Sequence, residues 1–330
     1  MTLAAPRPLV FDTLRALSTE QFCSGEALAD QLGVSRASIS LALQQARELG
    51  VPVHSVHGRG YRLSQPVDWL DASQIQAMRQ AGAPPLEVLS VADSTNSQLL
   101  SRAAQAVHGL CLTAEFQTAG RGRRGRSWQA ALGGSLAFSV LWRFPGGISQ
   151  LSGLSLAVGV AVVRVLHRLG LQAAQLKWPN DILVDGHKLA GILIETQGDA
   201  LGPIQAVVGI GMNVRLPDNL QQQIDQRTTD LAAHLPHLPS RNALLALLLD
   251  ELQAVSAQFV DAGFAAFREE WQYYHVWQGQ PVQVCYHDDH CLAGVAMGVD
   301  AAGALLLHDG VTVRPVAAGE VSLRAAKDRT

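Results

Sequence analysis

Residues 177–195 read Lys177-Trp-Pro-Asn-Asp-Ile-Leu-Val-Asp-Gly-His-Lys-Leu-Ala-Gly-Ile-Leu-Ile-Glu195, and this stretch decides the fold of the largest part of the chain. The apolar runs at 182–184 and 189–194 predict two strands, and Asp185-Gly186 between them predicts a tight turn. Outward from it, strand patterns (86–92, 135–144) alternate with long apolar helix patterns. We therefore expect a mixed α/β domain over residues 86–275, with room for an active site.

The same stretch carries candidate site residues. Asn180 and Asp181 stand just before the first strand, and Asp181 is the first acidic residue after a gap of 65 residues. One carboxylate beside a nucleotide phosphate suffices to hold Mg²⁺, so Asp181 is a candidate metal residue. Lys188 is one of three lysines in the chain, with Lys177 and Lys327. A lone lysine behind a turn is usually solvated, so that alternative stays open.

Residues 120–128, GRGRRGRSW, form a second cluster. Its glycines match GxGxxG, but the acidic residue that a dinucleotide fold needs about 20 positions later is absent. Glycines let a ligand approach the backbone, and guanidinium groups bind phosphate or carboxylate. The pattern favours a mobile loop that orders over an anionic ligand, with Trp128 as an apolar anchor; a solvated basic loop is the alternative. Eight cations and no acid between Glu115 and Asp181 also favour an anionic ligand.

Asp93-Ser94-Thr95-Asn96 follows the strand pattern 86–92 and precedes a helix pattern. Short polar side chains cap any helix start, which is an ordinary structural role. A helix N-terminus is also a site for an anion or a polar ligand.

Residues 1–66 predict a winged helix-turn-helix. Ser24 and Ser35 are expected to cap two helices that end at Gly33 and Gly50, and a hairpin follows with Arg59 at its tip. The third helix offers polar side chains to a DNA groove: Arg36, Ser38, Ser40, Gln44 and Gln45. Six arginines against five acidic residues leave the unit nearly neutral. An inert packing or dimerisation unit is therefore the alternative to DNA binding.

Residues 67–85 predict a connecting helix and a Pro-Pro break, and residues 276–330 predict a small β-barrel. The four cysteines lack CxxC spacing and are expected to be free thiols of a cytosolic protein. A zinc site at Cys285, His287, His290 and Cys291 fits no common pattern. The net charge of −3 excludes a strongly basic protein, and 48% hydrophobic residues exclude a disordered one. No stretch approaches 18 uninterrupted apolar residues, so no membrane span is expected.

Taken together, these residues resemble the bifunctional biotin–protein ligases that also repress the biotin operon. The matching pieces are DSTN at 93–96, AEFQTAGRGRRGRSW at 114–128, KWPNDILVDGHKLAGILIE at 177–195, GIGMNV at 209–214 and GEVSLR at 319–324. The resemblance implies an α+β multidomain chain. Its parts would be the winged helix-turn-helix, a class II synthetase-like ligase domain and a C-terminal SH3-like barrel.

The resemblance also implies a reaction in two steps. Biotin and ATP would give biotinyl-5′-AMP and pyrophosphate with Mg²⁺, and a lysine of the biotin carboxyl carrier protein of acetyl-CoA carboxylase would then take the biotinyl group. The adenylate-bound chain would homodimerise and bind operator DNA.

Residue roles carry over by position. The implied biotin residues are Ser94, Thr95, Asn96, Gln117, Arg121, Gly122, Arg123, Lys188 and Gly191. The implied nucleotide residues are Arg123, Arg126, Trp128, Asn180, Asp181 and Asn213. Lys188, Arg123 and Asp181 would be catalytic, and Arg36, Ser38, Ser40, Gln44 and Arg59 would contact DNA.

One departure from the family concerns the segment after GIGMN, where repressor-type members often have a tryptophan. Residues 214–235 contain none, and Thr228 is near the expected place. Three further interpretations stay open: a ligase whose helix-turn-helix no longer represses, a ligand-sensing regulator without ligase turnover, and a lipoate–protein ligase.

Overall fold

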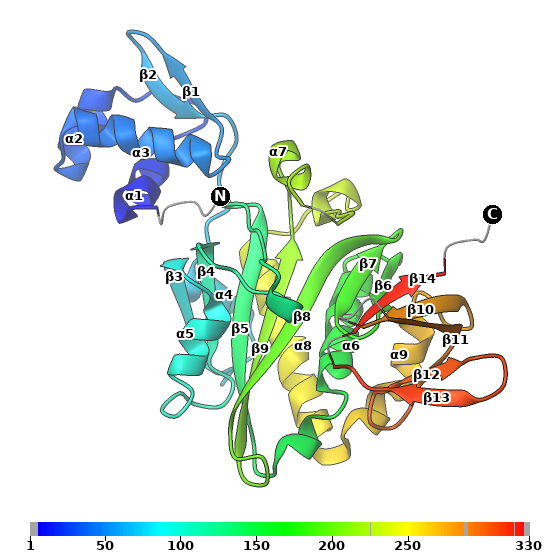
Figure 1. Cartoon of the computed structure of the whole chain (residues 1–330). Coiled ribbons are helices and arrows are strands. Elements are labelled where there is room, and N and C mark those ends of the chain that lie inside the picture. Colours follow the sequence, from blue (N-terminus) through cyan, green and yellow to red (C-terminus); the bar gives the residue numbers. More distant parts are fainter. Residues whose placement is uncertain (1–5, 225, 287–289, 320, 327–330) are drawn as a thin grey trace.

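The computed structural model describes residues 6–224, 226–286, 290–319 and 321–326. The N-terminal helices and their hairpin stand apart from a large central sheet, and the C-terminal strands lie at the other end of that sheet (Figure 1).

The N-terminal unit consists of helices followed by a two-stranded hairpin. The elements are α1 (Pro8–Ala16), α2 (Gly25–Leu32), α3 (Arg36–Glu48), β1 (Val53–Val56) and β2 (Gly60–Leu63). Ser24 and Ser35 accept backbone hydrogen bonds at 3.0 and 3.1 Å, and Gly33 ends α2 in the left-handed region (φ 64°). The expected caps are confirmed, and the apolar residues of the three helices form one buried core.

In the described part of the chain, the central sheet has seven strands in the order β3-β4-β5-β9-β8-β7-β6. The strands are β3 (Leu86–Ala92), β4 (Cys111–Gln117), β5 (Ser135–Phe144), β6 (Ala174–Lys177), β7 (Asp181–Val184), β8 (His187–Gly198) and β9 (Ile204–Asn213). β3 and β4 pair in parallel, and the other neighbours pair antiparallel. The stretch 177–195 therefore forms the end of this sheet, with Asp185-Gly186 as the turn between β7 and β8.

Helices cover the two faces of the sheet unequally. α6 (Leu154–Arg168) and α8 (Arg241–Ala262) pack together on the face that carries Phe138, Val140 and Trp142. α5 (Thr95–Ser101) lies on the opposite face, where Leu99 packs with Leu141. α4 (Ala72–Met78), α7 (Asp218–Gln221) and α9 (Arg268–Tyr274) complete the α-helices of the described residues. The face carrying α5 is left partly open, and the site lies there.

Two helices, Ile148–Arg168 and Arg241–Ala262, are long and apolar enough to cross a membrane by length and composition alone. Both belong to the main core, with α6 buried along most of its length. Their apolar character is accounted for by packing against the sheet and against each other.

The C-terminal strands form a five-stranded antiparallel sheet in the order β13-β12-β11-β10-β14, counted over the described residues. They are β10 (Pro281–Cys285), β11 (Cys291–Val299), β12 (Leu305–His308), β13 (Val313–Val316) and β14 (Ser322–Ala325). This sheet packs beside α9 (Figure 1).

The expectation of four free thiols is wrong for two cysteines. Cys285 and Cys291 stand opposite each other in the β10–β11 register and form a disulfide, whereas Cys23 and Cys111 are free. The spacing alone could not reveal this, because only the strand register places the two Cα atoms 4.1 Å apart. His287 of the zinc alternative lies outside the described residues, and the described ones contain no cluster of three metal-ligating side chains.

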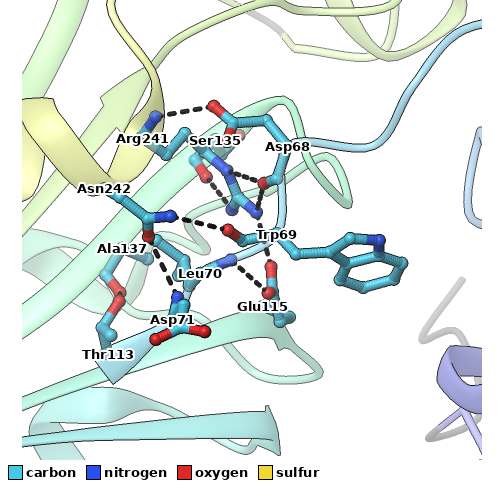
Figure 2. A network of polar contacts seen from close by, with 10 residues as sticks. All are labelled: Asp68, Trp69, Leu70, Asp71, Thr113, Glu115, Ser135, Ala137, Arg241 and Asn242. Carbon is cyan, nitrogen blue, oxygen red and sulfur yellow. Dashed lines mark hydrogen bonds and ion pairs between the residues drawn. The ribbon is translucent and has the colours of Figure 1, made fainter. Parts of the chain in front are cut away.

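The segment that joins the N-terminal unit to the sheet is held by a buried ion pair (Figure 2). Arg241, the first residue of α8, pairs with Glu115 of β4 at 2.6 Å, and both side chains are fully buried. The Arg241 guanidinium also donates to the carbonyl oxygens of Asp68 and Ser135. Glu115 in turn accepts from the backbone N–H of Leu70 at 2.7 Å. We call these residues, Asp68, Leu70, Glu115, Ser135 and Arg241, the linker clamp.

Neighbouring contacts extend the clamp in both directions. Asn242 accepts from the Asp71 backbone and donates to the Trp69 carbonyl (Figure 2). The Trp69 ring lies under the Arg15 guanidinium, 4.7 Å from its centroid, and edge-on to Phe11. The linker is thus fastened to the sheet on one side and to α1 on the other.

Acid is expected to destabilise the fold through His275, which is 3% exposed and stacks on Trp271. Burial lowers the pKa of His275 from 6.5 to about 4. Between these values the unfolded chain binds the proton and the folded chain does not, so stability falls as the pH drops below about 6.5. The expected loss is about 2 kcal/mol at about pH 5. Urea unfolding at about pH 5 and about pH 8 measures it, and His275→Gln should lose about 2 kcal/mol less between these pH values. An equal loss in both proteins would contradict the assignment.

Candidate active site

Polar side chains at the start of α5 form one end of the site. The Thr95 backbone N–H and hydroxyl both donate to Gln117 Oε1, at 2.7 and 3.2 Å. Ser139, fully buried on β5, donates to Asn96 Oδ1 at 2.6 Å and lies 2.8 Å from the Thr95 hydroxyl. Ser94, the N-cap residue of α5, is 3% exposed. The expected capping role is wrong for Ser94, whose side chain makes no capping hydrogen bond; the Thr95 and Asn96 side chains are instead tied to β4 and β5 under the open face.

Glycines on β9 allow this arrangement. A Cβ atom at Gly209 would overlap the Asn96 amide, and one at Gly211 would lie 2.5 Å from the Trp128 ring. The strand floor thus has no side chains where α5 and the arginine loop (residues 120–128) approach it. This explains why the GIGMN stretch alternates glycine with apolar residues.

The arginine loop has a defined path over the site. The Gly120 carbonyl accepts from the Trp128 backbone N–H at 2.8 Å. The Gly122 backbone N–H donates to the Arg126 carbonyl at 2.7 Å. Arg124 takes a left-handed conformation (φ 58°) at the turn. The prediction that the loop orders over an anionic ligand stays a prediction, because it concerns a bound state.

Arg123 reaches from the loop into the site. It donates to Asn180 Oδ1 at 2.9 Å and to the carbonyl oxygens of Ala318 and Gly319 at 3.1 and 2.5 Å. Burial lowers the pKa of Arg123, and the nearby Asp181 carboxylate opposes that shift. The C-terminal unit therefore supplies backbone oxygens that orient a loop arginine.

Lys188 and Asp181 form an ion pair at the centre of the site. Nζ and Oδ1 are 2.7 Å apart, at an angle outside that of a hydrogen bond. Lys188 Nζ also lies 5.9 Å from the centroid of the Trp128 ring. Gly191 leaves room for the lysine, since a Cβ there would lie 3.2 Å from Nζ. Lys177 is nearby; burial lowers its pKa, and Asp181 partly opposes the shift.

Every predicted ligand residue lines one or both of two adjoining cavities. A narrow cavity of about 60 Å³ is lined by Ser94, Thr95, Asn96, Gln117, Arg121 and the floor of β8 and β9. A wider one of about 520 Å³ is lined by Arg126, Lys177, Asp181, Asn213, Thr228 and Ser322, among others. Among the described residues, five line both cavities: Gly122, Arg123, Trp128, Asn180 and Lys188. A group bound in one cavity can therefore meet a group bound in the other beside Lys188.

Buried polar atoms without partners mark the wider cavity as a polar ligand site. Within the described chain, Trp128 Nε1, Thr228 Oγ1 and Ser322 Oγ are buried, line this cavity and have no hydrogen-bond partner. Leaving such a group unsatisfied is costly, so a ligand that hydrogen-bonds them gains affinity. Asn213 also lines this cavity, with its amide donating to the Thr229 carbonyl at 3.0 Å.

The argument from eight unopposed cations is wrong for four of them. Arg121 pairs with Glu195 beside the narrow cavity. Arg164 pairs with Glu251 and Glu270, and Arg168 pairs with Glu251, on the far face of the sheet. Arg143 donates to backbone carbonyls near residue 104. These acids are distant in sequence, so the acid-free stretch exaggerated the local charge. Arg121 lies beside the cavities too, together with Arg123, Arg124, Arg126 and Lys177.

The predicted DNA-contacting side chains are accessible. Arg36, Ser40 and Gln44 are exposed on α3, and Arg59 is exposed at the hairpin tip over the Phe22 ring. Ser38 is partly buried, and its hydroxyl lies 2.9 Å from that of Ser35. DNA contact stays an expectation for all five positions, Ser38 included.

Sequence reasoning missed several residues of the site. Ser139 sits in an apolar strand pattern, and nothing in its sequence surroundings indicates a ligand. Ser322 lies in the matching piece GEVSLR at 319–324, but no role was given to it there. Glu195 could have been singled out, because it ends the stretch 177–195 with a charge directly after the apolar run 189–194.

Comparisons with known proteins agree with this geometry. Residues 88–213 match the biotin/lipoate A/B protein ligase family, residues 10–62 an HTH domain, and residues 279–324 the biotin protein ligase C terminal domain. The bifunctional ligase/repressor BirA of Escherichia coli (strain K12) is 38% identical over 311 residues, which cover 94% of this chain and 96% of that protein. The chain belongs to the bifunctional biotin–protein ligase/repressor family.

Other members of this ligase family resemble the chain over shorter lengths. The biotin--[acetyl-CoA-carboxylase] ligase of Mycobacterium tuberculosis is 34% identical over 79% of this chain and 97% of its own length. The solved biotin protein ligase from Aquifex aeolicus in complex with biotin and ATP aligns with a TM-score of 0.62 and 27% identity, over 73% of this chain and 99% of that one. The ligase fold, with its mixed sheet, is shared with these relatives.

Proposed function

We propose that this chain attaches biotin to a lysine of the biotin carboxyl carrier protein of acetyl-CoA carboxylase through biotinyl-5′-AMP, and represses transcription when loaded with the adenylate. One observation carries the ligase half: two cavities meet at five shared lining residues that include Lys188. A reaction between two bound substrates needs such a junction.

The narrow cavity, about 60 Å³ in the free chain, would widen to hold biotin, with the ring system against Ser94, Thr95, Asn96 and Gln117. Its carboxylate would point to the junction, beside Lys188 and Arg123. The wider cavity would hold ATP, with the unpartnered Thr228 and Ser322 hydroxyls and the Trp128 indole N–H as hydrogen-bonding groups. Arg126, Asn180 and Asn213 would complete the nucleotide end. Thr228 would then stand in for the family tryptophan by a hydrogen bond in place of a ring contact.

In the first step a biotin carboxylate oxygen would attack the α-phosphorus of ATP, and the bond to the β-phosphate oxygen would break to release pyrophosphate. Lys188 Nζ, 2.7 Å from Asp181 in the free chain, would neutralise the charge shared by the carboxylate and the α-phosphate. In the second step the carrier lysine amine would attack the acyl carbon, and AMP would leave. Catalysis would come from positioning and charge, without a covalent enzyme intermediate.

Mg²⁺ fits Asp181 as an ion carried by the nucleotide phosphates. Asp181 uses Oδ1 for Lys188, which leaves Oδ2 for a cation, and one carboxylate plus phosphate oxygens is a usual Mg²⁺ ligand set. The described residues contain no cluster that would hold the ion without a nucleotide. When bound, the ion would supply neutralisation of the polyphosphate charge.

Incubation of the purified chain with biotin, MgCl₂ and α-³²P-labelled ATP tests this function. We expect a labelled biotinyl-adenylate, and none when lipoate replaces biotin. Adenylate formed with lipoate alone would transfer the proposal to lipoate ligation. Folded protein that forms neither would leave a binding-only regulator.

Arg123→Gly is expected to release the adenylate prematurely. The guanidinium joins the loop to Asn180 and to the C-terminal carbonyls, so its loss would open the junction to water. We expect labelled adenylate to be released about tenfold faster, which is the size of effect of losing one charged hydrogen bond. Rapid filtration measures the release rate. Arg168→Gly, on the far face of the sheet, is the control. An unchanged release rate for Arg123→Gly would refute the role.

The repressor half rests on the helix-turn-helix match and on the exposed side chains of α3 and the hairpin. We propose that the adenylate favours a homodimer that binds operator DNA, through a higher affinity of the adenylate for the dimer-competent state. Sedimentation equilibrium with and without biotinyl-5′-AMP gives the two self-association constants. Equal constants would exclude this coupling and leave a ligase whose helix-turn-helix no longer represses.

We also infer functional units at residues 1–66, 67–85, 86–275 and 276–330, a class II synthetase-like ligase unit, an SH3-like closure of the C-terminal strands and a cytoplasmic location. The strand order of the two sheets and the matched family ranges support the units.

A further inference from the structure

A single carboxylate joins the two walls of the narrow cavity. Glu195 lies near the end of β8, and its side chain is 18% exposed. Oε2 accepts from the Asn96 amide of α5 at 3.0 Å. Oε1 pairs with the Arg121 guanidinium of the arginine loop. None of the ligand roles derived above involves Glu195, because it holds groups that would touch a ligand.

The hydrogen bonds fix which way the Asn96 amide points. Its nitrogen faces two acceptors, the Leu193 carbonyl at 3.2 Å and the Glu195 carboxylate at 3.0 Å. A carboxylate and a carbonyl can only accept, so the NH₂ group must be on this side. The amide oxygen then accepts a hydrogen bond from the Ser139 hydroxyl at 2.6 Å. Glu195 is therefore one of the two acceptors of the Asn96 NH₂ group, and these two hydrogen bonds hold the first turn of α5 in place.

The same carboxylate holds the first arginine of the loop. Among the described residues, Arg121 makes one other side-chain hydrogen bond, to Ser97 Oγ at 2.9 Å, and its side chain is 47% exposed. Without the Glu195 charge, that bond to a neutral hydroxyl would have to keep the arginine over the cavity. The contacts of Arg123 hold the middle of the loop, and the Arg121–Glu195 pair holds its start.

We propose that Glu195 is a positioning residue for adenylation, which holds Arg121 and Asn96 in place on the two sides of the bound acid. This inference rests on the proposed function for its kinetic consequence, whereas its structural consequence is measurable without any substrate. Loss of the charge frees the start of the loop, and loss of the whole carboxylate also frees the Asn96 amide.

Limited trypsin digestion of the ligand-free chain is the first test, because trypsin cuts after the loop arginines 121, 123, 124 and 126 once the loop opens. We expect loop cleavage to be about fivefold faster in Glu195→Gln, the size of effect of a partly exposed ion pair. Glu87→Gln is the matched control: it removes a comparable Arg–Glu pair, with Arg102, outside the cavity. Loop cleavage in Glu195→Gln that stays at the rate of the unmodified chain would overturn the proposal.

Adenylation kinetics supply the second readout. Glu195→Gln keeps an oxygen for Asn96, so we expect the KM for biotin to rise about fivefold while kcat stays within about twofold. Glu195→Ala removes both contacts and should raise the KM further, by about tenfold or more. A KM that falls in Glu195→Gln would mean that Glu195 competes with the substrate for Arg121, and would overturn the positioning role.

The two readouts separate the possible failures. Faster loop cleavage in a chain that adenylates neither biotin nor lipoate would support the holding role of Glu195 and refute the ligase function. Normal biotin adenylation in the unmodified chain, with unchanged cleavage and KM in both variants, would refute the Glu195 inference alone. Circular dichroism of each variant excludes misfolding as the cause.

Discussion

Lys188→Ala is expected to lower the rate of biotinyl-adenylate formation by about 100- to 1,000-fold, the size of effect of removing a preorganised charge from a reaction centre. Lys188 lines both cavities and forms the 2.7 Å ion pair with Asp181 in the free chain. A cation at this junction faces both the biotin carboxylate and the α-phosphate, so its effect should be largest where negative charge is shared between them. The rate is measured by single-turnover formation of labelled adenylate at saturating biotin and ATP.

Lys177→Ala is the matched control for Lys188→Ala. Lys177 lines only the wider cavity, so its loss should weaken ATP binding and leave the chemical step closer to normal. We expect the KM for ATP to rise about tenfold, with kcat within a few-fold of the unmodified chain. Near-normal adenylate formation by Lys188→Ala would remove the role given to this lysine, and equal kcat losses in both variants would make it one cation among several.

Arg241→Met should produce the largest loss of stability of any substitution considered. Arg241 and Glu115 are fully buried, so the substitution leaves an uncompensated carboxylate and frees the Asp68 and Ser135 carbonyls. Breaking one side of a buried pair costs about 3–5 kcal/mol. Urea unfolding followed by circular dichroism measures the change in the free energy of unfolding.

The double variant Arg241→Met, Glu115→Gln distinguishes the ion pair from simple packing. It has no buried charge at this place, so it should be more stable than the sum of the single losses predicts, by about 1–3 kcal/mol. The exposed pair Arg314–Asp309 gives a control with little expected effect. Strictly additive losses, or a loss below about 1 kcal/mol in Arg241→Met, would show that the clamp does not hold the linker by charge.

Much of the fold followed from local signals. The caps at Ser24 and Ser35 and the strands on either side of Asp185-Gly186 come from patterns within one element, and each is found where the sequence predicts it. The candidate ligand residues could also be named from the sequence, because the motifs bring several polar groups to consecutive positions. The cavities then gather these motifs from strands that are neighbours only in the folded sheet.

What the sequence could not supply are pairings between distant segments. The Cys285–Cys291 bond depends on the strand register, and the partners of Arg164 and Arg168 lie more than 80 residues away. Ser139 looks like an ordinary strand residue until α5 is laid over it. A residue that only holds a ligand residue in place, without touching the ligand, can lack any local pattern of its own.

The linker clamp also decides where this chain can be divided. A proteolytic fragment that begins at residue 67 keeps Asp68, Trp69 and Leu70, so the Arg241 guanidinium and the Glu115 carboxylate remain paired and satisfied. A fragment that begins at residue 72 removes the Asp68 carbonyl and the Leu70 N–H from a buried ion pair and exposes it at a new edge. The two fragments differ by five residues, yet only the longer one keeps the linker clamp complete. Residues 68–71 are therefore part of the ligase unit as well as of the linker. A cut that separates the DNA-binding domain and keeps the linker clamp must fall on their N-terminal side.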